Sequence, residues 1–266
     1  MSIIIAIANQ KGGVGKTTTA VNLGASLAIA EKKTLIVDVD PQGNSTTGLG
    51  IERPTLQRSL YHALIGEASL PEILLQSELP YLFVAPSTKD LTGAEIELVN
   101  AERREWRLRD ALRSVDEQFE YILLDCPPSL GLLTLNAFTA AHSVLVPLQC
   151  EYYALEGLTS LLETVKLVQQ GLNPDLHLEG ILLTMFDSRN RLSHQVAEEI
   201  RSHFPDRLFH TVVYRNVRLS ESPSHGKPAL LYDIHSTGAQ NYLDLAKELI
   251  RNREEIGRAD TEKGTG

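Results

Sequence analysis

The sequence contains few of the residues that cross-link a secreted protein or hold a protein in a membrane. Only two of its 266 residues are cysteine, Cys126 and Cys150, which is too few for a disulfide framework and favours a reducing compartment. The apolar stretch at the N-terminus, Ile3 to Ala8, follows no basic segment, and no run of 18 apolar residues occurs. We therefore expect neither export nor a membrane span, and we predict a cytoplasmic protein.

The length and the apolar pattern predict an α/β protein. A chain of 266 residues with 42% hydrophobic residues can bury a full core. Strand-like runs alternate with helical stretches and lie near residues 3–8, 34–39, 81–85, 121–125, 143–148, 178–184 and 210–213. This alternation predicts a mainly parallel sheet flanked by helices on both faces. We assign residues 1–251 to a single domain and expect the charged segment 252–266 to be disordered.

Two segments have contrasting helical patterns. The segment before Gly171 and Pro174 has one apolar face, which predicts a helix packed on the core, formed by Leu155, Leu158, Leu161, Leu162, Val165 and Val168. Residues 94–113 alternate arginine with glutamate, which predicts a helix with a solvated face.

A glycine-rich loop follows the first predicted strand. In the pattern G-x-x-x-x-G-K-[ST], backbone N–H groups surround phosphates, the lysine reaches the β and γ oxygens, and the hydroxyl binds Mg²⁺. Gln10 replaces the first glycine of this pattern, and an additional lysine, Lys11, follows it. The loop therefore predicts a phosphate site formed by Gly12, Gly13, Val14, Gly15, Lys16, Thr17 and Thr18.

Acidic residues end two further predicted strands. Asp38 and Asp40 end the second strand before the turn Pro41-Gln42-Gly43, and Asp125 ends a later strand before Cys126-Pro127-Pro128. In open α/β sheets, ligands bind at the carboxyl ends of the strands. Asp125 has the position of a Walker B aspartate, which would hold Mg²⁺ through its water shell. Asp38 could lie near the same ion or only cap its strand.

The motifs resemble those of one family of ATPases. Lys11-Gly-Gly-Val-Gly-Lys-Thr-Thr18 resembles the deviant Walker A motif of the ParA/MinD group, and Asp125-Cys-Pro-Pro-Ser129 is similar to the switch II segment of chromosomal ParA (Soj-like) proteins. The resemblance extends to about Leu249 and implies ATP and Mg²⁺ as cofactors. It also implies a homodimer that forms around ATP, in which Lys16 contacts its own nucleotide and Lys11 that of the partner subunit. Further roles that it implies are the orientation of the attacking water by Asp40 and Mg²⁺ binding by Thr17, Asp38 and Asp125.

The distribution of charge leaves DNA binding open. The whole chain has a net charge of −9, but residues 189–227 contain seven arginines and lysines against four acids, a local charge of +3. Such a segment could be an ordinary solvated surface, or it could bind DNA, because affinity follows the phosphates that local basic residues neutralise. The segment Tyr214 to Ser224 resembles the family's C-terminal signature, which contacts DNA without sequence preference. The resemblance thus implies nonspecific DNA as a partner, contacted by Arg189, Arg215 and Arg218.

The sequence departs from the family pattern at Tyr214. Family members usually have proline at this position, in a loop close to the adenine. A tyrosine could stack on the base or pack outward, and both interpretations stay open. We include Tyr214 among the residues that could bind the nucleotide.

The resemblance predicts an ATPase that segregates chromosomes or plasmids and associates with the nucleoid. Its turnover would be slow until a ParB-like (Spo0J-like) protein stimulates hydrolysis and releases the monomers from DNA. A ParA-like ATPase that positions a cargo other than DNA would share every motif. A MinD-like membrane ATPase requires a C-terminal amphipathic helix, but Ile256 is the only large apolar residue after Ile250. An iron–sulfur ATPase requires a second cysteine ligand beside Cys126, and none is evident.

Overall fold

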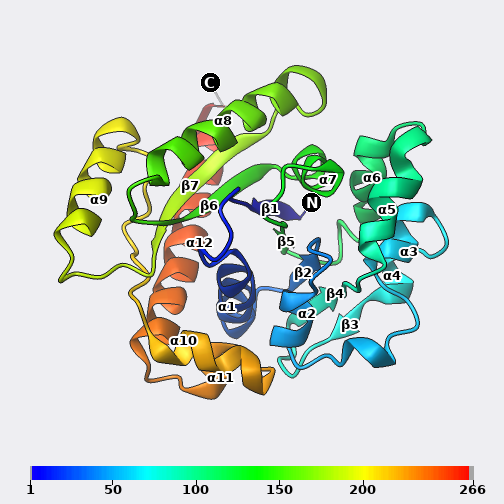
Figure 1. The fold of residues 1–266 in the computed structure, drawn as a ribbon, viewed down its shortest axis with the longest axis horizontal. Helices are drawn as coiled ribbons and strands as arrows, with labels where there is room; N and C mark the ends of the chain where they lie inside the picture. The colour runs from blue at the N-terminus through cyan, green and yellow to red at the C-terminus, as the bar shows by residue number, and fades with distance from the viewer. Residues whose placement is uncertain (1, 264–266) are drawn as a thin grey trace.

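The fold is built around a seven-stranded sheet of strand order β3-β4-β2-β5-β1-β6-β7 (Figure 1). The computed structural model describes the backbone of residues 2–263 and the side chains of residues 2–255. All neighbouring strands are parallel except β3, which pairs antiparallel with β4. The strands are β1 (Ile3–Ile7), β2 (Thr34–Asp38), β3 (Leu75–Gln76), β4 (Leu82–Ala85), β5 (Tyr121–Asp125), β6 (Ser143–Gln149) and β7 (His177–Thr184).

Helices cover both faces of this sheet, as the sequence predicts. The longer helices are α1 (Lys16–Ile29), α7 (Leu132–Ala140), α8 (Ala154–Gly171), α9 (Arg191–His203) and α12 (Thr237–Lys263). The shorter ones are α2 (Asn44–Gly48), α3 (Leu60–Ile65), α4 (Leu70–Ile73), α5 (Leu91–Glu97), α6 (Arg107–Leu112), α10 (Val217–Glu221) and α11 (Ala229–Tyr232). Four 3₁₀ helices complete the described part of the chain: η1 (Arg53–Thr55), η2 (Leu98–Asn100), η3 (Arg104–Trp106) and η4 (Ser222–His225).

The central strands are buried on both sides, which explains their nearly continuous apolar sequences. Along β1, Ile4 and Ala6 pack into the core formed with helices α3 to α9, whereas Ile5 and Ile7 pack into the core formed with α1, α11 and α12. Every residue of β2 and β5 is buried. The two-sided core fixes the sheet and leaves the loops at its carboxyl edge to form a site.

The apolar stripe predicted between residues 155 and 168 is confirmed in α8. Its buried side chains are Ala154, Leu158, Leu161, Val165 and Val168, and the helix ends at Gly171.

The strand expected at residues 210–213 does not form. This segment runs along the edge of β7, where Val213 N–H donates to Leu183 O at 2.9 Å. However, the N–H groups of His210 and Thr211 donate to the buried carboxylate of Glu248 in α12, at 2.7 and 2.9 Å. Because these two amides bind a side chain, they are not available for a strand ladder.

The single helix expected over residues 94–113 is divided into α5, η2, η3 and α6. The interruption lies at Arg103, whose φ of 52° is left-handed and cannot continue a right-handed helix. Asn136 of α7 fixes the new direction, since its side chain accepts from Leu108 N–H at 3.0 Å and donates to Arg104 O at 2.9 Å. A distant side chain thus overrides the local helical pattern.

The segment expected to be disordered from residue 252 is helical as far as the structure describes it. Helix α12 continues to Lys263. Within it, Arg253 forms an ion pair with Glu179 of β7 and donates to Ser143 Oγ at 3.1 Å. This tertiary contact holds the helix against the sheet edge. Residues 264–266 lie outside the described residues.

Candidate nucleotide-binding site

The glycine loop and the acidic strand ends meet at the carboxyl edge of the sheet. Asp125 is the register partner of both Ile7 in β1 and Asp38 in β2, so three neighbouring strands end at the same level. A cavity of about 550 Å³ opens beside them. Its lining includes Gly12, Gly13, Gly15, Lys16, Thr17, Thr18, Asp40, Met185, Val213, Tyr214, Arg215 and Asn216.

The loop between β1 and α1 is held open by glycine conformations and by side chains from other strands. Gly13 and Gly15 have φ values of 73° and 91°, which L-residues with side chains rarely adopt. Thr184 of β7 donates to Val14 O at 2.7 Å, and Asn9 donates to Pro147 O at 2.8 Å. Because Gly15 directly precedes α1, the N-terminus of this helix lies at the cavity, where it favours a bound phosphate.

Lys16 supplies a buried positive charge to the same cavity. Only 7% of the residue is exposed, and its Nζ donates to Lys11 O at 3.0 Å. Burial lowers the pKa of Lys16, while the nearby Asp125, Cys126 and Asp40 oppose this shift. A buried ammonium group interacts strongly with the negative charge of a polyphosphate, because little water screens the two charges.

Lys11 is placed differently, at the surface beside the loop that follows β6. Its side chain forms an ion pair with Glu151, and both side chains are about half exposed. Tyr152 and Tyr153, which follow Glu151, are also exposed. The two lysines of the motif therefore have different surroundings, one buried in the cavity and one on an open face.

Asp38 and Asp125 form a buried pair of carboxyl groups. Asp38 Oδ2 accepts from Thr46 N–H at 2.8 Å and from the Thr46 hydroxyl at 2.6 Å, and Asp125 Oδ2 accepts from the Ser45 hydroxyl at 2.7 Å. Burial, together with the neighbouring Asp125, raises the pKa of Asp38 to about 8. Burial also raises the pKa of Asp125 to about 6, against the effect of the Ser45 and Thr17 hydroxyls.

The two carboxyl groups fit a divalent cation. Within the described residues, the Oδ1 atoms of both Asp38 and Asp125 are buried and have no hydrogen-bond partner. Thr17 lies in the first turn of α1 and lines the adjacent cavity. Carboxylate and hydroxyl oxygens suit Mg²⁺, which usually keeps several waters. These three residues are the ones that could hold the ion.

Asp40 lies past the end of β2 and faces the cavity. Its Oδ1 accepts from Gln42 N–H at 2.9 Å, and its carbonyl accepts from Gly43 N–H at 2.9 Å, which closes a tight turn. Gly43 adopts the left-handed φ of 65° that this turn requires. The side chain is thus held in a cavity that also contains Lys16 and Thr17.

Tyr214 also lines the cavity. Val213 and Leu219 line it as well, together with the polar Arg215 and Asn216, and 41% of Tyr214 is exposed. The Tyr214 ring meets Phe186 edge to face with 5.9 Å between centroids. A cavity lined by a glycine loop, a buried lysine and an aromatic ring has groups that suit both the phosphates and the base of a nucleotide.

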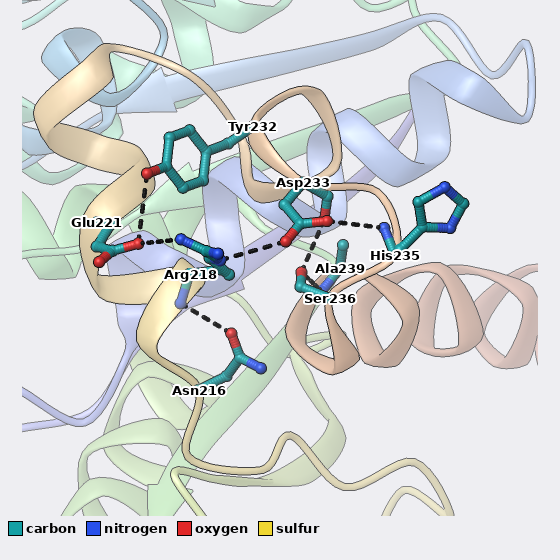
Figure 2. Close-up of polar contacts among 8 residues, drawn as sticks. All are labelled: Asn216, Arg218, Glu221, Tyr232, Asp233, His235, Ser236 and Ala239. Carbon is teal, nitrogen blue, oxygen red and sulfur yellow. Dashed lines mark hydrogen bonds and ion pairs between the residues drawn. The ribbon is translucent and has the colours of Figure 1, made fainter.

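Of the three arginines chosen from the sequence, Arg215 and Arg218 lie on one segment and Arg189 lies on another, and the three differ in their partners. Arg189, with 87% of its side chain exposed, forms a two-bond pair with Asp187 at 3.0 and 3.1 Å. Arg215 lines the cavity. Arg218 in α10 forms ion pairs with Glu221 and Asp233 (Figure 2). The sequence did not predict that Glu221 and Asp233 pair with Arg218.

Several residues that shape the site were not singled out from the sequence. Ser45 and Thr46 hold the two buried acids, Asn9 positions the loop, and Glu151 pairs with Lys11. The hydroxyls of Ser45 and Thr46, directly after the glycine turn, were a usable signal. No sequence signal pointed to Glu151, because its approach to Lys11 depends on the packing of β6 beside β1.

A glycine loop between a parallel strand and a helix, with a buried lysine and acids on adjacent strands, defines a P-loop nucleotide-binding protein. The family model described as an AAA domain matches residues 2–178. The chain is 62% identical to the chromosome partitioning protein ParA of Myxococcus xanthus over 93% of its length and 88% of that protein. It is 58% identical to the sporulation initiation inhibitor protein Soj of Bacillus subtilis, over 95% and 100%. The chain belongs to the ParA/Soj family of partitioning ATPases.

Solved structures agree with this fold. A cobyrinic acid a,c-diamide synthase from Mycobacterium smegmatis with bound ADP and magnesium has a TM-score of 0.84 and 37% identity, with 96% of each chain covered. The Pyrococcus furiosus cell division ATPase MinD has a TM-score of 0.78 and 26% identity, with 94% of this chain and 99% of that chain covered. In the part of this chain that is described, no helix has the length and apolarity to cross a membrane.

Proposed function

We propose that this chain is a DNA-partitioning ATPase in which ATP bridges two monomers and the resulting dimer binds DNA without sequence preference. The observation that most supports this proposal is that one segment, residues 213–218, both lines the nucleotide cavity and contains Arg218. Val213 to Asn216 line the nucleotide cavity, and the same segment continues directly into α10 and Arg218. Nucleotide and DNA would therefore contact neighbouring residues of one segment.

The proposed chemistry is in-line attack of water on the γ-phosphate. Lys16 and the N–H groups at the start of α1 stabilise negative charge on the transferred phosphoryl group. Thr17, Asp125 and Asp38 would hold Mg²⁺, which neutralises phosphate charge when bound. Asp40, fixed by its bond to Gln42 N–H, orients the attacking water.

Lys11 is proposed to act on the nucleotide of the partner subunit. Its position on an open face, paired only with a half-exposed glutamate, supports this role. Ion pairs between exposed side chains are worth about 0–1 kcal/mol, so Lys11 can exchange Glu151 for a phosphate at low cost. The monomer would then lack one of its catalytic groups, and its intrinsic hydrolysis would be slow.

Hydrolysis is proposed to release the dimer from DNA through the segment after Asp40. Ser45 and Thr46 in α2 bond to the two buried acids, so a change at the γ-phosphate can alter this short helix. A ParB-like partner would stimulate the step by completing or ordering the site. The protein would then move between the nucleoid and the free cytoplasm.

Substitution of the arginines, one at a time, tests the DNA contacts. Arg189→Ala, Arg215→Ala and Arg218→Ala should each weaken binding to duplex DNA and reduce the slope of log K against log salt by about 0.9, one phosphate contact. ATP-dependent dimerisation should not change in the variants of Arg189 and Arg218, which are not among the residues that line the nucleotide cavity. Arg113→Ala is the matched control, because Arg113 is an exposed arginine that also pairs with an acid, Asp110.

The outcome separates DNA from other cargo. Unchanged DNA binding in all three variants would place the DNA contacts elsewhere. An absence of DNA binding in the unmodified protein, with ATP-dependent dimerisation intact, would favour a ParA-like ATPase that positions a different cargo.

A further inference from the structure

Arg218 lies between two carboxylates (Figure 2). Its Nη1 is 2.9 Å from Glu221 Oε2, and its Nε is 3.2 Å from Asp233 Oδ2. The guanidinium carbon lies 5.9 Å from the centre of the Tyr232 ring, and the Tyr232 hydroxyl donates to Glu221 Oε2 at 3.3 Å. We call Glu221 and Asp233 the carboxylate clamp. It occupies donors that a DNA phosphate would need.

The charge of the clamp opposes DNA binding. Two carboxylates surround one guanidinium, so the group has a net charge of −1 and repels a phosphate instead of attracting it. Nevertheless, 48% of the Arg218 side chain is exposed, so a phosphate can reach it once the acids move away. Exposed ion pairs of this kind are weak and exchange readily. The clamp can therefore act as a reversible block.

The clamp is attached to the wall of the nucleotide cavity. Asn216, Leu219 and Ser220 line that cavity, and they lie in or next to the five-residue helix that also contains Arg218 and Glu221. Asn216 caps this helix by accepting from Arg218 N–H at 2.9 Å. Because Arg218 and Glu221 lie on the same short helix, a ligand that displaced Asn216 or Ser220 would move both of them relative to Asp233, which belongs to the next segment.

A close backbone contact provides a second connection to the catalytic residues. Gly50, just after α2, packs against Gly226 at the end of η4, and a Cβ atom added to Gly226 would lie 2.7 Å from Gly50 Cα. No side chain can be inserted here without movement. Because packed backbone transmits displacement, a shift of α2 reaches the segment that contains the clamp.

We propose that the carboxylate clamp keeps Arg218 from binding DNA until nucleotide occupies the cavity and moves α10, and with it Arg218, away from Asp233. This inference rests on the DNA binding proposed above and describes its regulation. It predicts that Asp233 reduces DNA affinity in the nucleotide-free protein and has little effect in the ATP-bound dimer, whereas Glu221 stays beside Arg218 in both states.

Binding of a labelled 30-base-pair duplex of arbitrary sequence, measured by fluorescence anisotropy, tests this inference. Glu221→Gln and Asp233→Asn remove one charge each and preserve shape, and an asparagine at 233 can still accept from His235 N–H, as Asp233 Oδ1 does now. Without nucleotide, each variant should bind DNA about fivefold more tightly, with a salt slope steeper by about 0.9. With a non-hydrolysable ATP analogue, the affinity of Asp233→Asn should lie within about twofold of that of the unmodified protein, whereas Glu221→Gln, on the same helix as Arg218, should keep its gain.

Two further variants separate the clamp from a general effect of charge. Asp244→Asn removes the same charge from an exposed pair with Lys247 in α12, and it should change DNA affinity equally with and without nucleotide. The double variant Glu221→Gln, Arg218→Gln should lose the gain of Glu221→Gln, because the clamp acts only through Arg218.

The results distinguish this inference from the proposed function. If the unmodified protein binds DNA with the analogue but the clamp variants gain no more than Asp244→Asn without nucleotide, the inference is wrong and the proposed function stands. An equal gain of Asp233→Asn in both nucleotide states also contradicts it. If neither the unmodified protein nor any variant binds DNA in either state, the proposed function fails and the clamp fails with it.

Discussion

At the scale of single residues, the buried pair Asp38 and Asp125 has too few partners for two negative charges. The raised pKa of Asp38, about 8, means that the folded protein retains a proton that the unfolded chain releases near pH 4. The free energy of unfolding of the metal-free protein should therefore fall as the pH rises from about 4 to about 8. Asp38→Asn should remove much of this dependence and stabilise the metal-free protein at pH 8, because an amide needs no proton to stay neutral.

Urea unfolding in EDTA, followed by circular dichroism between pH 5 and pH 8, measures this effect. Asp244→Asn, at an exposed ion pair, serves as the control and should leave the pH dependence unchanged. Equal stability of the unmodified protein across this range would show that Asp38 does not hold a proton in the fold.

Lys16 is the residue whose loss should affect nucleotide binding most. Lys16→Ala removes a buried ammonium group from the phosphate end of the cavity, and charge-assisted bonds of this kind predict roughly 100-fold weaker binding. Titration with a fluorescent ATP analogue measures the change. Lys166→Ala, at an exposed position of α8, should bind normally. Full affinity in Lys16→Ala would remove this lysine from the phosphate site.

Asp40 can be tested without disturbing the turn in which it lies. Asp40→Asn keeps an oxygen that can accept from Gln42 N–H but lacks the charge that orients water. Hydrolysis should fall by roughly 10²- to 10⁴-fold, as for other residues that position or accept protons, while the ATP-bound dimer persists. Phosphate release and light scattering measure the two properties. A variant that hydrolyses ATP at the normal rate would assign water positioning to another group.

At the scale of elements, the glycine loop and the loop after β6 meet at the pair of Lys11 with Glu151. Lys11→Ala should leave ATP binding to the monomer within about twofold, because Lys16 supplies the buried charge, but it should abolish the ATP-dependent dimer. Sedimentation velocity with a non-hydrolysable ATP analogue measures dimerisation. An equally tight dimer in Lys11→Ala would refute action of this lysine across the interface.

The sequence predicts a strand well where the apolar pattern of the segment itself decides its position. The strands that became β1, β2 and β5 are apolar runs whose neighbours are other apolar runs, so their position follows from local pattern. Prediction failed where distant side chains intervene. Glu248 binds the amides of residues 210 and 211, and Asn136 redirects the chain near Leu108. The two-residue strand β3 is too short to give a pattern.

Some features of the candidate site can likewise be predicted from the sequence, and others cannot. The phosphate loop and the acids at strand ends are predictable because motif and position coincide in the sequence. The pairing of Lys11 with Glu151, 140 residues apart, requires the tertiary fold. The pairing of Arg218 with Asp233 was also missed, because Asp233 approaches from a separate segment, 15 residues later in the sequence.

At the scale of the whole molecule, both proposed ligands depend on one edge of the sheet. The loops at the carboxyl ends of β1, β2 and β5 line the candidate nucleotide cavity, and the segment from Val213 to α10 lines the same cavity. The overall charge of −9 repels DNA, so binding requires a local basic surface. Dimerisation would double that surface and raise affinity without new contacts in each subunit.

The most direct test is the binding of the purified protein to nonspecific duplex DNA with ATP, with ADP and without nucleotide, at two salt concentrations. Binding should require ATP and weaken steeply with salt, because several phosphates are neutralised by a dimer that only ATP can form. Binding of equal strength in all three states would contradict the nucleotide switch. No binding in any state, while ATP still drives dimerisation, would contradict DNA as the cargo.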